Sequence, residues 1–278
     1  MKEQSLLSLD PHGFHRMAYT EWGDPNNPRV LVCVHGLTRN GRDFDYLAEK
    51  LSDAYRVVCP DIVGRGKSDW LRVKADYGYP VYMSDLSALM AKLGAEQVDW
   101  VGTSMGGIIG MLMSGIPGSP VKKLVMNDVG ALIPKAALER LGMYVGSVPE
   151  FESLEALDAA MRSISPFGTL TDAQWRSIAA SSSKQDPDGK WRLRYDPGLA
   201  ETFKAKPFTD VDMRAFWSAI PCPVLVVRGD SSDLLLQETL EEMKQRPDTQ
   251  AHVVANTGHA PMLMDDAQVA VIRKFLLG

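Results

Sequence analysis

Cysteine is scarce in this chain, with only 3 residues in 278. They are Cys33, Cys59 and Cys222, which lie far apart, and each begins or lies within a predicted buried strand. Neither a disulfide framework nor a cysteine-based metal site has this spacing. We therefore expect three buried free thiols, a reducing compartment and no metal.

The chain also lacks a basic surface signature and long apolar runs. Its formal net charge is -5 and its Lys and Arg residues form no basic stripe, so nucleic acid is not an expected partner. No segment approaches the length of a membrane span, and acidic and polar residues interrupt the short apolar run of residues 1–11, unlike a signal peptide. These absences predict a cytoplasmic protein with neither membrane nor nucleic-acid partners, and they leave its oligomeric state open.

What the chain has is a regular alternation of strand and helix patterns. Its length and its 45% hydrophobic content are enough to bury one large core. After a hairpin over residues 5–22, short apolar runs alternate with helical patterns, which predicts a mostly parallel sheet with helices on both faces. In such a sheet, ligands bind at the carboxyl ends of the strands.

The alternation stops between about Gly130 and Trp217. Apolar residues at helical spacing, such as Leu154, Leu157 and Met161, occur there, but no run fits a strand of the main sheet. We interpret Ser181–Gly189 as one exposed loop. The segment is long enough for several helices outside the main sheet.

The most informative motif is Gly102–Gly106, with the sequence Gly-Thr-Ser-Met-Gly. An apolar run precedes it and a helical pattern of small residues follows it, so Ser104 is expected at the apex of a tight turn from strand to helix. Flanking glycines allow the strand and helix to approach closely, and the turn exposes the serine hydroxyl. Ser104 is therefore the candidate nucleophile, whereas a plain glycine-rich turn is the alternative.

A second motif, His35-Gly36-Leu37, follows the buried strand predicted at residues 30–34. A loop at this end of a strand can direct backbone N–H groups into the site, where they stabilise the negative oxygen of a tetrahedral intermediate. We assign this oxyanion hole to the N–H groups of Leu37 and Met105. His35 itself is expected to form hydrogen bonds within its loop and not to act as the base.

A third motif supplies the general base. A serine hydroxyl needs an imidazole within hydrogen-bond reach to accept its proton. His259 lies in a loop after the last predicted strand and before a final amphipathic helix at about residues 265–277. The other four histidines are in turns, strands or the Leu37 loop, which favours His259.

These motifs, in the order serine, acid, histidine, resemble those of the α/β-hydrolase superfamily, and the resemblance covers nearly the whole chain. Asp61–Asp69 is similar to the loop after the fourth strand of its esterases, and a phosphate-binding reading of its Gly-Lys-Ser fails because Asp61 stands where a P-loop needs glycine. The resemblance implies a mostly parallel eight-stranded sheet flanked by helices. It also implies a core domain of residues 1–130 and 217–278, with residues 131–216 inserted after the sixth strand as a helical cap.

The resemblance leaves the acid of the triad open. Members usually carry it three residues after the glycine that ends the seventh strand, and that position here is Ser232. Asp233 is one residue late and Asp230 is two early, whereas Asp128 matches members with the acid at the end of the sixth strand. We rank Asp233 first, Asp128 second and Asp230 third.

The function predicted from these residues is serine hydrolysis of a small carboxylic ester through an acyl-enzyme, without a metal or an organic cofactor. The same triad serves carbon-carbon bond hydrolases, lactonases and perhydrolases of this superfamily, and the fold does not choose among them. Dehalogenases and epoxide hydrolases are disfavoured because they need a carboxylate at position 104. The non-enzyme alternative is a ligand receptor with a decayed triad.

Overall fold

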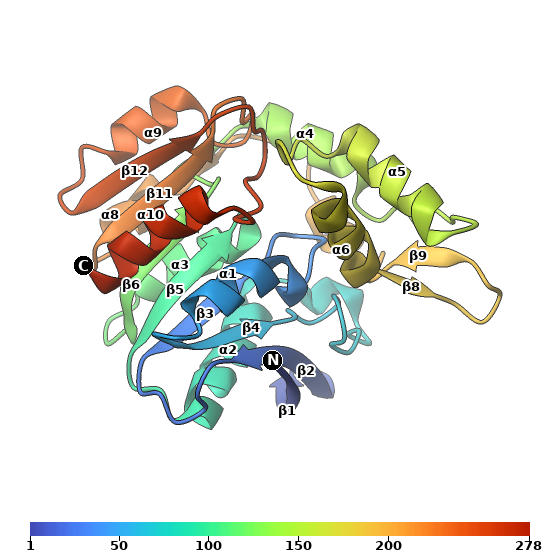
Figure 1. The fold of residues 1–278 in the computed structure, drawn as a ribbon, viewed down its shortest axis with the longest axis horizontal. Coiled ribbons are helices and arrows are strands. Elements are labelled where there is room, and N and C mark those ends of the chain that lie inside the picture. Colours follow the sequence, from blue (N-terminus) through green and yellow to red (C-terminus); the bar gives the residue numbers. More distant parts are fainter.

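We describe the protein from a computed structural model of residues 1–278 (Figure 1). The main sheet contains eight strands: β1 (Lys2–Asp10), β2 (Gly13–Trp22), β3 (Val30–Val34), β4 (Arg56–Pro60), β5 (Val98–Thr103), β6 (Val121–Asn127), β11 (Val224–Gly229) and β12 (Thr249–Val254). Four shorter strands form two further pairs: β7 (Leu132–Ile133) with β10 (Val211–Asp212), and β8 (Ser183–Gln185) with β9 (Trp191–Leu193). The α-helices are α1 (Asp45–Leu51), α2 (Tyr79–Leu93), α3 (Met105–Ser114), α4 (Lys135–Tyr144), α5 (Leu154–Ile164), α6 (Asp172–Ser182), α7 (Leu199–Phe203), α8 (Arg214–Ser218), α9 (Gln237–Met243) and α10 (Asp266–Leu277). Two 3-10 helices complete the fold, η1 (Gly41–Phe44) and η2 (Lys74–Asp76).

The strands of the main sheet follow the order β1-β2-β4-β3-β5-β6-β11-β12. β1 and β2 pair antiparallel, and β2 also runs antiparallel to β4. All pairs from β4 to β12 are parallel, so their carboxyl ends share one edge of the sheet. The predicted mostly parallel eight-stranded sheet is therefore confirmed.

Both faces of the central strands are buried, as their unbroken apolar runs require. Every residue of β3 is buried, and its side chains alternate between two hydrophobic clusters. Val30 and Val32 belong to the cluster that includes α2 and α3. Leu31 and Cys33 pack with α1 and α10, which lie together over the other face in Figure 1. The expected helices on both faces are thus present.

The N-terminal hairpin is anchored to the body by a buried histidine. His15 lies between two carboxylates, with Nδ1 3.0 Å from Asp10 Oδ2 and Nε2 2.9 Å from Asp85 Oδ2. Burial alone lowers the pKa of His15, but the hydrogen bonds and charges of Asp85 and Asp10 outweigh it and raise the pKa above its usual value. The pairing joins the hairpin to α2 most strongly when the imidazole is charged.

Residues 131–216 contribute no strand to the main sheet. In Figure 1, α4, α5, α6 and the β8–β9 hairpin gather beyond one end of the sheet. The prediction of one exposed loop at Ser181–Gly189 is wrong: Ser181 and Ser182 end α6, Ser182 and Ser183 are buried, and residues 183–185 form β8. Strands of three residues are too short to show a period in the sequence. Two main-chain hydrogen bonds join this segment to the loop after β4, from Gly66 N to Arg194 O at 2.9 Å and from Asp196 N to Gly64 O at 2.7 Å.

The three cysteines are buried and free, as predicted. None of the helices combines the length and apolarity needed to cross a bilayer.

Candidate active site

Ser104 occupies the turn between β5 and α3 in a strained conformation. Its φ of 52° and ψ of -115° are uncommon for any residue other than glycine. The Ser104 N–H donates to Asn127 O at 2.9 Å, and its C=O accepts from the N–H groups of Gly107 and Ile108. The surrounding main chain therefore fixes the serine at the head of α3.

Two glycines make this turn possible. A Cβ atom at Gly102 would lie 2.2 Å from the Gly106 carbonyl oxygen, and one at Gly106 would lie 1.9 Å from the Val34 carbonyl oxygen. Both distances are far shorter than any ordinary contact, so β3, β5 and α3 approach each other only because these side chains are absent. The motif predicted this geometry.

The Leu37 and Met105 N–H groups make no hydrogen bond within the chain. For Met105 this follows from its place in the first turn of α3, where N–H groups have no intrahelical acceptor. Leu37, Ser104 and Met105 line the same cavity. The serine and the two residues with free N–H groups thus border one space.

His35 is part of the framework of the Leu37 loop. It is fully buried, its Nδ1 lies 2.7 Å from Gly36 O, and its Nε2 accepts from the Ile62 N–H at 2.9 Å. Desolvation lowers the pKa of His35 to about 3, so the ring is neutral at pH 7. It ties the loop after β3 to the loop after β4, in agreement with its expected structural role.

His259 contacts a carboxylate at the end of β6. Its Nδ1 lies 2.7 Å from Asp128 Oδ2, and Asp128 is fully buried. The same carboxylate accepts the Gly229 N–H at 2.8 Å and the Ser232 hydroxyl at 2.6 Å. A carboxylate accepts from Nδ1–H, which leaves Nε2 of a neutral imidazole free to take a proton.

The expectation that Asp233 orients His259 disagrees with these contacts. Asp233 is exposed, and its carboxylate pairs with Arg140 at 2.5 Å. The third choice, Asp230, is also exposed and accepts two backbone N–H groups, which lower its pKa. Asp233 lies one residue beyond the inward position after β11, so its side chain points outward and Ser232 occupies that position. The imidazole of His259 is instead hydrogen-bonded to Asp128, the second choice.

Asn127 connects the serine loop to the histidine loop. Its carbonyl accepts from Ser104 N, and its side-chain Nδ2 donates to Pro261 O at 2.8 Å. The Ser104 hydroxyl and the His259 ring make no hydrogen bond to each other. Sequence reasoning missed Asn127, since an amide that ends a strand carries no signal of its own.

The cavity beside Ser104 has a volume of about 530 Å³ and is mostly apolar. Hydrophobic residues make up 17 of its 23 lining residues, and Lys206 is the one formally charged side chain in the lining. Its walls come from α2, α3, the stretch after β6 and residues 199–213, with Tyr82, Ile108, Leu141 and Phe208 among them. Such a space accommodates a small substrate with apolar groups around its reacting bond.

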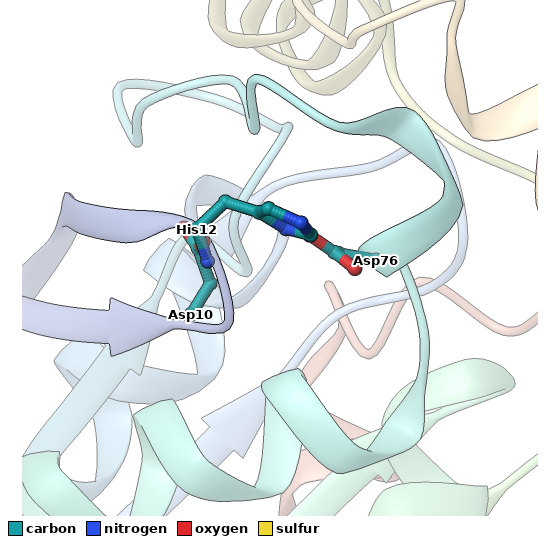
Figure 2. Close-up of side chains that lie close together, drawn as sticks. All are labelled: Asp10, His12 and Asp76. Carbon is teal, nitrogen blue, oxygen red and sulfur yellow. The ribbon is translucent and has the colours of Figure 1, made fainter.

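One group of side chains has potential metal-ligand atoms close to one another. Ligand atoms of Asp10, His12 and Asp76 lie within 4.8 Å of one another, and Figure 2 shows the His12 ring directed at Asp76. His12 Nδ1 is 2.6 Å from Asp76 Oδ2, and Asp10 Oδ1 accepts the main-chain N–H of His12 at 2.7 Å. None of the three lines the cavity. Their mutual hydrogen bonds, which link the hairpin turn to η2, account for the cluster.

Three comparisons with known proteins point to the same family. The model of the alpha/beta hydrolase family matches residues 31–272. The 3-hydroxybutyrate-oligomer hydrolase of Cupriavidus necator is 50% identical over 97% of this chain and 96% of its own. A crystal structure of a hydrolase candidate from Rickettsia typhi superimposes with a TM-score of 0.94 at 30% identity, covering 100% of this chain and 99% of that one. An alpha/beta hydrolase from Novosphingobium aromaticivorans has a TM-score of 0.89 at 33% identity over 99% and 98% of the two chains.

Proposed function

The chain belongs to the alpha/beta hydrolase family, and from this membership we propose that it hydrolyses carboxylic esters through an acyl-enzyme on Ser104. The observation that carries the proposal is the cavity that Ser104 lines together with Leu37 and Met105, whose N–H groups have no acceptor within the chain. A half-buried serine that shares a cavity with two free donor residues is the arrangement that acyl transfer needs.

The first half of the reaction forms the acyl-enzyme. Ser104 Oγ attacks the ester carbon while His259 Nε2 accepts its proton, and Asp128 stabilises the resulting imidazolium. The former carbonyl oxygen becomes negative and accepts the N–H groups of Leu37 and Met105. His259 then protonates the departing alcohol. In the second half, water attacks the acyl carbon, His259 takes a proton from the water and returns one to Ser104, and the acid leaves.

We further propose that the substrates are short oligomers of 3-hydroxybutyrate. The support is the 50% identity to a relative named for that activity, together with the size and apolar walls of the cavity. Each 3-hydroxybutyrate unit is a short methyl-branched chain between two esters, which suits an apolar space of about 530 Å³. Residues 131–216 act as the cap that shapes this space. The buried thiols suit a reducing compartment, and a cytoplasmic location is part of the proposal.

The proposal predicts that Ser104→Ala removes ester turnover. Hydrolysis of the 3-hydroxybutyrate dimer and trimer and of p-nitrophenyl butyrate would be measured for the wild type and the variant. A fluorophosphonate probe would label the wild type and leave Ser104→Ala unlabelled, because only an activated serine reacts. Ser163→Ala, at an exposed serine of α5, is the matched control and should behave as wild type.

Three results would count against parts of this proposal. Equal ester turnover by the wild type and Ser104→Ala would reject the nucleophile. An unlabelled wild type without turnover would favour a binding protein with a decayed triad. Turnover of p-nitrophenyl butyrate without cleavage of the dimer or trimer would reject the substrate while leaving the mechanism in place.

A further inference from the structure

Arg65 is the only residue of the Gly64–Ser68 motif that carries a charge into the interior. Its side chain is fully buried. Nε donates to Leu37 O at 2.7 Å, Nη1 donates to Val63 O at 2.8 Å and to the Tyr82 hydroxyl at 3.0 Å, and Nη2 contacts Met105 Sδ at 3.5 Å. None of these acceptors is a carboxylate, and Arg65 forms no ion pair. A guanidinium is charged at every physiological pH, so a net positive charge lies buried here.

A buried cation without a counter-ion is costly for stability. Burial of an unpaired charge carries a desolvation penalty that neutral hydrogen bonds offset only in part. The Tyr82 ring, 5.0 Å from the guanidinium carbon, adds a cation-π contribution, but this is small beside that penalty. A neutral side chain of similar volume would fill the same space, so stability alone does not explain an arginine at this position.

The contacts of Arg65 connect it to the two donors of the proposed oxyanion hole. Nε binds the carbonyl of Leu37, and Nη2 contacts the side chain of Met105. The N–H groups of these two residues are the free donors beside Ser104. Arg65 thus contacts both donor residues, and it is not itself among the residues that line the cavity.

The charge itself has a direct electrostatic consequence. The interaction between charges is many times stronger in a water-free interior than in bulk water. In the tetrahedral intermediate a negative charge forms between the Leu37 and Met105 N–H groups, next to a buried cation that the ground-state ester, being neutral, does not engage. An interaction that is stronger in the transition state than in the ground state raises kcat and leaves KM nearly unchanged.

We propose that Arg65 is the positioning residue of the oxyanion hole: it fixes the Leu37 and Met105 donors, and its buried charge favours the oxyanion. The inference rests on the proposed ester hydrolysis. It gives the Gly-Arg-Gly-Lys-Ser motif a role that is neither a phosphate loop nor a simple turn.

The test uses Arg65→Met, which keeps the volume and removes the charge and donors, and Arg65→Lys, which keeps the charge. For p-nitrophenyl butyrate, kcat of Arg65→Met should fall by about 10²- to 10³-fold, the usual effect of losing one oxyanion donor, with little change in KM. Arg65→Lys should recover part of this loss. The same loss should appear in the affinity for an alkyl trifluoromethyl ketone, which forms an oxyanion on serine, but not in the affinity for the matching unreactive amide.

Arg246→Met is the matched control for a structural role. Arg246 also donates to two carbonyls, Ile220 O at 2.6 Å and Cys222 O at 2.7 Å, and its guanidinium carbon lies 5.3 Å from the Trp217 ring. It does not line the cavity, so its variant should lose stability and keep kcat. Thermal unfolding of each variant separates the two effects.

Two outcomes would overturn the role of Arg65. One is a kcat of Arg65→Met near the wild-type value. If Arg65→Met does not fold, the corresponding result is an Arg65→Lys variant with a kcat near the wild-type value and an unchanged affinity for the ketone. The other is an equal loss of affinity for the ketone and the amide, which a displaced loop would cause. Both leave wild-type turnover and fluorophosphonate labelling intact, whereas failure of the proposed function would remove them.

Discussion

Asp128 accepts three hydrogen bonds, from His259, Gly229 and Ser232, and this concentration of donors predicts its role. In Asp128→Asn an amide would replace the acceptor and favour the wrong imidazole tautomer, so kcat should fall by about 10⁴-fold. Asp233→Asn is the control and should keep kcat, since Asp233 pairs with Arg140 at the surface. A large loss in Asp233→Asn with a small one in Asp128→Asn would restore the order of preference derived from the sequence.

Single residues differ in how far the sequence reveals them. Ser104 and the Leu37 loop belong to short motifs whose chemistry depends on neighbours in the chain. The acid does not, because Asp128 and His259 are 131 positions apart and three aspartates offer the same carboxylate. The choice among the three aspartates depends on which side chain points inward after β11, and tertiary packing decides this. Arg65 gave no signal because its partners come from three separate segments.

At the scale of elements, the packing of α3 against β3 depends on Gly106. In Gly106→Ala the new Cβ would meet the Val34 carbonyl oxygen at 1.9 Å, so helix and strand must separate. Overpacking of this kind costs about 1–3 kcal/mol or more of unfolding free energy, and it would displace Ser104. Gly115→Ala, whose Cβ would meet Ala219 Cβ at 3.4 Å, is the control at the other end of α3. Urea unfolding and ester turnover measure both effects, and equal stability of the two variants would contradict the argument.

The strands of the main sheet and the helices beside it were predictable because each has a clear apolar run or a helical period. Val30–Val34 and Val224–Val227 are unbroken apolar runs, and the buried residues of α10, Val269, Ile272, Phe275 and Leu276, have helical spacing. The β8–β9 hairpin was not predictable, since strands of three residues form only when tertiary contacts bring them together. The division at residues 131–216 stays a prediction.

For the whole molecule, the raised pKa of His15 predicts how stability depends on pH. The protonated ring is stabilised by Asp85 and Asp10 in the folded state, so its contribution is complete below the usual pKa of 6.5 and is lost as the pH rises through the folded-state pKa. The wild type should therefore exceed His15→Gln in unfolding free energy by more at about pH 6 than at about pH 9. Urea unfolding at both values tests this. His12→Gln, at a half-exposed ring, is the control, and a gap that widened with pH would refute the assignment.

The main-chain hydrogen bonds between residues 64–66 and 194–196 limit how a substrate gains entry. Asp196 also accepts the Tyr77 hydroxyl at 2.6 Å, so the chain around residues 194–196 is held to the loop after β4 and to the segment before α2. A rigid-body movement of the segment that contains residues 194–196 would have to break all of these hydrogen bonds together. Residues 205–209 line the cavity, are largely exposed and make no such main-chain hydrogen bonds to the loop after β4, so we expect the ester to enter on this side.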